Sequence, residues 1–249
     1  MEFNSSKCKI MHLGNRNNEF EYRMEGKVIE SVNEEKDLGV WVTRSLKPAK
    51  QCETAALQAG LALRSIAKSF HYRRTDVMVP LYKTFVRPKL EYAIAAWAPW
   101  TEQDIEVLEN VQKRFVKLLS DKRGNTYEER LDNAGLTTLR ERRERGDQIE
   151  TYKVIKGINR VDKNAWFLFR SEDETRNTRA TTTITTEGEL RKTDVLYMGN
   201  VRLEVRKNSF NVRVIRKWNA LPEEVKNAKS LNAFKNAYDS WAKQQKQSL

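Results

Sequence analysis

The chain of 249 residues has little of what defines several common classes of protein. Its two cysteines, Cys8 and Cys52, cannot support a disulfide scaffold, and two histidines, His12 and His71, add too little for an ordinary four-ligand zinc site. No apolar run approaches the roughly 18–20 residues that cross a bilayer, and no basic start precedes an apolar signal segment. We therefore expect an intracellular protein, nuclear or cytoplasmic, that is not secreted and has no membrane partner.

Motifs that would identify an enzyme are also missing. The sequence contains no Gly-x-x-x-x-Gly-Lys and no Gly-x-Gly-x-x-Gly, so a loop that holds nucleotide phosphates is not indicated. Neither histidine lies in a nucleophile-elbow context. No Asp-Asp pair occurs, although a two-metal site requires closely placed carboxylates. We expect no complete catalytic site, no metal site and no cofactor in this chain.

What the sequence does have is positive charge. Lys and Arg number 46 against 34 Asp and Glu, which gives a net charge of +12. The basic residues form two clusters, at Lys113, Arg114, Lys117, Lys122 and Arg123, and at Arg140, Arg142, Arg143 and Arg145. Each cluster is explained either as a solvated helix face or as part of a surface that binds phosphates, with an affinity that falls steeply with salt. Trp41 and Tyr72 are additional candidates for stacking on bases.

Periodicity predicts a mainly α fold. The first 45 residues read as short strands, including one over 36–42 and a hairpin that turns at Glu25-Gly26. A helical stripe then runs from Cys52 to Phe70. Further helices are expected over 75–97, kinked by two prolines, and after Thr101, Thr126, Thr138 and Ser230, each of which is a typical capping residue. Alternation over 201–206 predicts a strand, followed by a helix over 210–221.

Several motifs resemble the reverse transcriptases of non-LTR (LINE-type) retrotransposons, most closely the jockey- or CR1-like branch. They lie in the same order over nearly the whole chain. The segments are Phe3-Asn4-x-x-Lys7-Cys8-Lys9-x-Met11-His12-x-Gly14, 34–40, 46–52, Leu81-Tyr82-Lys83-x-x-Val86-Arg87-Pro88-x-Leu90-Glu91-Tyr92, 95–99, 108–114, 127–131, 135–147, Trp218-Asn219-x-Leu221-Pro222-Glu223-Glu224-Val225 and 230–235.

The resemblance implies four segments. They are a palm-end β remnant with the primer grip (1–45), a thumb-like helical bundle (46–157), a loop or disordered linker (158–200) and a small C-terminal strand–helix module (201–249). It also implies that the hairpin through Leu38 and Gly39 holds the primer end, and that RNA and DNA, as a template–primer duplex, are the partners. The implied nucleic-acid contacts are Lys50, Arg64, Lys68, Lys113, Arg114, Lys117, Arg140, Arg142 and Arg143.

Lys7 matches a palm lysine that is sometimes assigned to protonating pyrophosphate, and it is equally explained as a lysine at a strand end. The family's Ala-Asp-Asp carboxylates, which use Mg²⁺ in an intact polymerase, its fingers and its endonuclease would precede Met1. The expected chain is thus a C-terminal fragment that binds template–primer and is inactive by itself. Two alternatives stay open: a host-adopted helical scaffold that binds proteins, and an enzyme completed by a second chain.

Overall fold

The computed structural model describes the chain except for residues 1–3, 5–6, 15–16, 121–125, 171–194 and 248–249. The described part is mainly helical, which confirms the expected fold class. The chain divides into two compact units, 1–140 and 141–249, and the division falls inside α7 (Leu139–Ile155). The four segments expected from the sequence stay a prediction.

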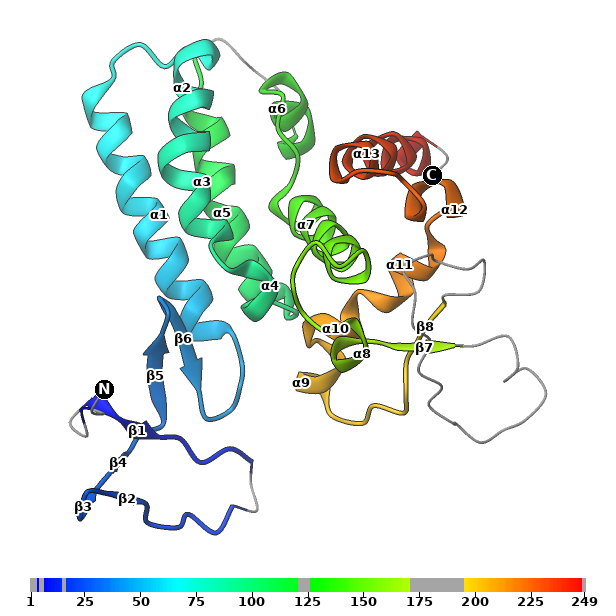
Figure 1. Cartoon of the computed structure of the whole chain (residues 1–249). Coiled ribbons are helices and arrows are strands. Elements are labelled where there is room, and N and C mark those ends of the chain that lie inside the picture. The colour runs from blue at the N-terminus through cyan, green and yellow to red at the C-terminus, as the bar shows by residue number, and fades with distance from the viewer. Residues whose placement is uncertain (1–3, 5–6, 15–16, 121–125, 171–194, 248–249) are drawn as a thin grey trace. The chain divides into compact units, whose positions relative to one another are not determined.

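Short strands begin the first unit (Figure 1). β1 (Lys9–Ile10) pairs in parallel with β4 (Glu30–Ser31), and β2 (Arg23–Met24) pairs with β3 (Lys27–Val28) across the expected turn at Glu25-Gly26. The single strand expected over 36–42 is wrong. The chain reverses at Leu38-Gly39, so that β5 (Glu34–Asp37) and β6 (Val40–Thr43) form an antiparallel hairpin. Both residues of this turn have positive φ, a conformation that a Leu rarely adopts and that sequence pattern therefore does not predict.

Helices build the rest of the first unit, and Figure 1 shows α1, α3 and α5 side by side. α1 (Ala49–Ser69) buries the small side chains Cys52, Ala55 and Ala59 together with Leu63, which lets α5 (Glu102–Leu118) approach closely. Tyr82 and Phe115 stack at 4.2 Å between ring centroids in this core. The expected helical stripe of α1 and the helix after Thr101 are confirmed.

The proline-containing segment between α1 and α5 is broken, as expected. It comprises α2 (Thr75–Leu81), a π-helical turn η2 (Tyr82–Val86), α3 (Arg87–Glu91) and α4 (Ile94–Trp97). The Arg87 N–H donates to the Tyr82 carbonyl, five residues back, which is the wide turn that π-helices have. Pro80 and Pro88 flank it, so the kink has an identifiable cause.

Local capping signals place the next helices correctly. α6 (Tyr127–Asn133) begins with a capping box in which Thr126 and Glu129 exchange hydrogen bonds. Gly135, with φ of +62°, follows its end, and the Leu136 N–H donates to the Leu131 carbonyl. α7 then carries the chain into the second unit.

The second unit begins on α7 and continues with short elements. They are α8 (Lys163–Trp166), β7 (Leu168–Arg170), β8 (Val195–Tyr197), α9 (Glu204–Lys207), α10 (Phe210–Arg213), α11 (Ile215–Ala220), α12 (Glu223–Lys226) and α13 (Leu231–Gln247). Its core contains Trp218, which is fully buried, and Phe234, whose ring stacks on Tyr152 at 4.3 Å between centroids. The Ser230 hydroxyl accepts the Ala233 N–H, so the expected cap of the last helix is confirmed.

One sequence prediction of secondary structure fails in this unit. Residues 201–206 form no strand: Val201, Arg202 and Leu203 are irregular and α9 follows. The strand lies earlier, because β8 finds a partner in β7 across a long sequence separation. The segment 158–200, which the sequence assigns to a linker, contains α8, β7 and β8, and its part over 171–194 lies outside the described residues.

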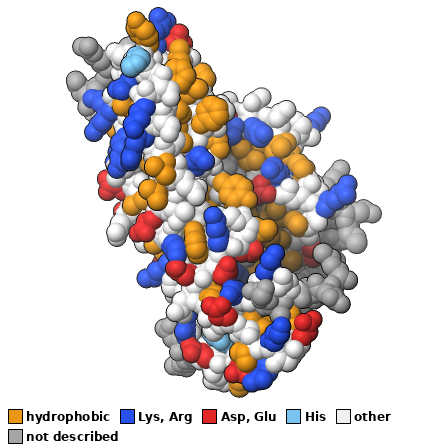
Figure 2. Space-filling view, turned by 90° about the vertical axis from the view of Figure 1, so that its left-hand side faces the viewer, with side chains coloured by type: hydrophobic (Ala, Val, Ile, Leu, Met, Phe, Trp, Pro, Cys, Tyr) orange, Lys and Arg blue, Asp and Glu red, His pale blue; other side chains and the backbone are white. Residues whose placement is uncertain are grey.

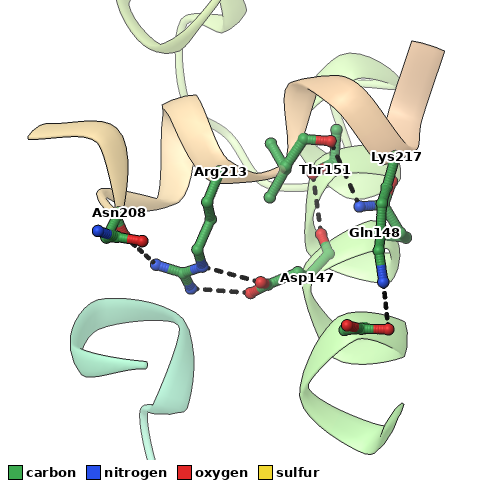
Figure 3. Close-up of polar contacts among 8 residues, drawn as sticks. Asp147, Gln148, Thr151, Asn208, Arg213 and Lys217 are labelled. Carbon is green, nitrogen blue, oxygen red and sulfur yellow. Dashed lines mark hydrogen bonds and ion pairs between the residues drawn. The ribbon is translucent and has the colours of Figure 1, made fainter. Parts of the chain in front are cut away.

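An ion pair joins α7 to α10 within the second unit. Figure 3 shows the Arg213 guanidinium donating to both oxygens of Asp147, each at 2.9 Å, and to the Asn208 carbonyl. The side chains of Arg213 and Asp147 are 17% and 13% exposed, so solvent screens this pair less than a surface pair. Lys217 pairs with Glu144 beside it. Within the described residues, no helix is long and apolar enough to cross a membrane.

Candidate nucleic-acid interface

The hairpin formed by β5 and β6 is fixed to the helices at two points. The Tyr92 hydroxyl donates to the Leu38 carbonyl at 3.0 Å, and the Trp41 N–H donates to the Gln51 side chain at 2.9 Å. Gly39 has φ of +86°, and a Cβ there would lie 3.3 Å from the Tyr92 ring. The hairpin tip is thus held beside Tyr92, while the Leu38 side chain is 85% exposed.

Lys50 joins the hairpin to the start of α1. Its ammonium lies 3.9 Å from the centroid of the Trp41 ring and pairs with the Glu34 carboxylate. A lysine whose ammonium already contacts an indole ring and a carboxylate must give up these contacts to bind an external phosphate. The same contact covers one face of Trp41, which is half-buried, whereas Tyr72 is 85% exposed.

The outward side of α1 carries both apolar and basic residues. Leu57 and Leu61 are 63% and 50% exposed, and the exposed Arg64 and Lys68 follow them at helical spacing. Figure 2 shows Lys and Arg side chains beside hydrophobic ones in the upper part of the face that includes α1. Within the described residues, Arg64 and Lys68 make no ion pair. The sequence prediction named these two cations but missed the leucines, whose exposure only the packing of α1 reveals.

The basic cluster at the end of α5 is partly engaged. Lys113 pairs with Glu106 at 3.3 Å and lies 5.8 Å from the Tyr127 ring centroid. Arg114 and Lys117 are exposed and have no ion-pair partner among the described residues. Lys122 and Arg123 lie outside the described residues.

Two arginines of the basic cluster of α7 are paired with acidic residues. Arg140 donates to both oxygens of Glu102 at 2.5 and 2.7 Å. Arg145 donates to both oxygens of Asp239 at 2.6 and 2.8 Å, and this hydrogen bonding raises the pKa of Arg145. Arg142 is half-buried, and Arg143 is only 7% exposed. A buried guanidinium is poorly placed to reach an external phosphate, so burial disfavours Arg143 as a nucleic-acid contact.

Lys7 is exposed and precedes β1, and its backbone N–H donates to the Asn4 carbonyl. Next to it, the Glu30 carboxylate accepts a hydrogen bond from Lys9 and raises the pKa of Lys9. Lys7 thus lies two residues before a strand. Within the described residues, no group of three or more His, Cys, Asp or Glu side chains could hold a metal ion.

Comparison with known proteins gives no independent identification. No family model, no curated protein and no solved structure matches the chain.

Proposed function

We propose that this chain binds a template–primer duplex through α1 and the hairpin formed by β5 and β6, as the thumb and flanking regions of a LINE-type reverse transcriptase. The sequence resemblance supplies the polymerase context. One structural observation carries the binding proposal. An exposed hairpin tip is fixed at one end of a long helix, and the outward side of this helix combines leucines with cations that have no ion-pair partner among the described residues.

The dimensions of α1 suit a duplex. Its 21 residues extend about 30 Å, a length over which a duplex presents many phosphates, at about one charge per 1.7 Å of its axis. Arg64 and Lys68 would bind phosphates on this surface. Leu57 and Leu61 would rest on the sugars of a wide, shallow minor groove, which is the groove that an A-form helix offers. Such a contact is independent of sequence, as a polymerase requires.

Titration of an RNA–DNA primer–template by fluorescence anisotropy at several salt concentrations tests the proposal. Each phosphate contact contributes about one unit to the slope of log affinity against log salt. The double variant R64A/K68A should therefore weaken binding equally for different sequences and reduce the slope by about 2. The matched control K229A/K243A removes two exposed cations of the second unit, and we expect it to preserve most of the slope.

Equal losses in R64A/K68A and the control would contradict a specific role for α1, because they would show a diffuse effect of net charge. Absence of binding by the unaltered chain at every salt concentration would overturn the proposal. It would favour the scaffold alternative, in which Leu57 and Leu61 contact a protein partner.

A further inference from the structure

The second unit contains an open cavity of about 730 Å³ that the proposed duplex contact does not use. Residues from α8, β7, β8 and the segment after it, α9 and α10 line it, with one residue of α11. The lining residues that matter here are Trp166, Tyr197, Met198, Arg202, Arg206 and Asn211. Its volume lies in the range of small-molecule sites, which is about 300–1,000 Å³.

Specific hydrogen bonds fix the parts of the cavity wall that carry Tyr197 and Trp166. Asn219 on α11 pairs with both backbone groups of Leu196, at 3.0 and 2.9 Å, and thereby holds the strand that leads into Tyr197. The Asn211 amide donates to the Trp166 carbonyl at 3.3 Å. The Phe210 ring lies 5.9 Å from the Trp166 ring at an interplanar angle of 77°. The cavity is therefore part of the packed unit rather than a gap between loose loops.

Aromatic side chains remain accessible in the cavity. Trp166 is 43% exposed and Tyr197 is 46% exposed, although the core of the same unit buries Trp218 completely. Large aromatic rings at a concave surface expose apolar area to water, and a ligand that stacks on them would bury that area favourably. A planar ligand would cover these rings without rearranging the fold.

The cavity is also electropositive. Its charged lining residues are Arg202 and Arg206, and no Asp or Glu is among the described residues that line it. Arg202 makes no ion pair in the described part of the chain, and Arg206 makes one long hydrogen bond of 3.4 Å to Asn211. The adjacent Glu204 is occupied by Lys207. Charge complementarity thus favours an anionic occupant.

From these observations we infer that the cavity binds unpaired nucleotides of a single-stranded nucleic acid. A base stacks on Trp166, with Tyr197 as a second platform, and the flanking phosphates pair with Arg202 and Arg206. Side-chain amides, Asn211 among them, line the cavity within the same surface and can donate to base edges. An apolar protein segment would cover the rings but would give neither guanidinium group an anionic partner, so the charge favours the nucleotide. The inference does not depend on the α1 contact.

Quenching of tryptophan fluorescence by an eight-residue oligothymidylate, measured on the full chain, tests this inference. Loss of one stacked base weakens binding roughly 5- to 150-fold, so W166A should lower the affinity by at least about fivefold. The variant R202A/R206A should reduce the salt slope by about 1.4, the value for two contacts to a single strand. W166F keeps a stacking ring, and we expect it to bind nearly normally while the quench disappears.

Two controls separate this site from general charge and from the α1 contact. R216A/K229A removes two exposed cations of the same unit that do not line the cavity, and its binding should match that of the unaltered chain. R64A/K68A should leave the oligothymidylate quench unchanged. An abasic strand of equal charge should bind more weakly than oligothymidylate and should bind W166A and the unaltered chain equally.

Three outcomes would overturn the inference. They are equal affinities of W166A and the unaltered chain, equal affinities of the abasic and base-containing strands, and equal effects of R202A/R206A and R216A/K229A. None of them bears on the duplex proposal, which the R64A/K68A titration tests separately.

Discussion

At the scale of single residues, the centre of the first unit depends on Gln112, which is fully buried. Its side chain accepts from the Tyr82 hydroxyl at 2.8 Å and donates to the Tyr127 hydroxyl and the Thr137 carbonyl. Glu109, one turn earlier, accepts from Tyr127 and from the Leu139 N–H that begins α7. Burial and the Glu109 hydrogen bond raise the pKa of Tyr127. This polar network joins α5 to three other segments of the unit.

We expect Gln112→Leu to lower the free energy of unfolding of the first unit by about 2–4 kcal/mol. The leucine conserves volume but leaves several buried polar groups without a partner. Native-state hydrogen exchange of the α5 amides measures the change. Gln103→Leu, at an exposed position of the same helix, is the control and should change protection little. Equal effects of the two substitutions would show that the network adds nothing to stability.

At the scale of elements, the hairpin formed by β5 and β6 has an unfavourable turn. Leu38 has φ of +44°, and the left-handed conformation costs a residue other than glycine roughly 1–2 kcal/mol. Asn followed by Gly is the preferred pair for a two-residue turn in which both φ values are positive. Leu38 is 85% exposed, so burial of its side chain does not offset this cost. Backbone strain of this kind is common at binding sites. It therefore supports a contact at Leu38 that forms only when the chain binds a partner.

Leu38→Asn should therefore stabilise the hairpin by about 1 kcal/mol, because Asn tolerates this conformation better and little apolar burial is lost. Hydrogen exchange of the β6 amides measures the gain in protection. Gly39→Ala is the opposite control: at φ of +86° and against the Tyr92 ring, it should reduce protection. A decrease in protection for Leu38→Asn would contradict the proposed strain.

At the scale of the whole molecule, the two units each have their own apolar core. Buried tyrosines make the stability of the second unit depend on pH. Burial raises the pKa of Tyr238 to about 12 and also raises that of Tyr152. An unfolded tyrosine ionises near pH 10. Between these values the unfolded chain releases a proton that the folded chain retains, so stability falls as pH rises.

Urea denaturation at pH 9 and pH 11, followed by circular dichroism, tests this linkage. The Tyr238 contribution is fully present below pH 10 and is lost toward pH 12, and we expect Tyr238→Phe to remove about 1–2 kcal/mol of the decrease between the two pH values. Tyr72→Phe, at a position 85% exposed, should leave the decrease unchanged. A decrease that is the same in Tyr238→Phe and the unaltered chain would exclude this tyrosine as its source.

Local signals in the sequence predicted most helices correctly. Thr101, Thr126 and Ser230 accept N–H groups of the first turns they precede, and such bonds involve residues only three apart. Prediction failed at the Leu38-Gly39 turn, whose backbone conformation is unusual for a Leu, and where pairing is distant in sequence. Alternation over 201–206 resembles a strand, but Leu203 is 72% exposed, and none of the strands in the described part of the chain pairs with this segment.

The sequence alone determined the mainly α class, the helix starts and the excess of cations, because these follow from neighbouring residues and from composition. The tertiary structure decided which cations remain available, since ion pairs such as Arg145–Asp239 join residues 94 positions apart. It also decided which apolar side chains stay exposed: Leu57 on α1 and Trp166 at the cavity look like core residues in the sequence. Burial depends on which surfaces meet, and local pattern does not contain that information.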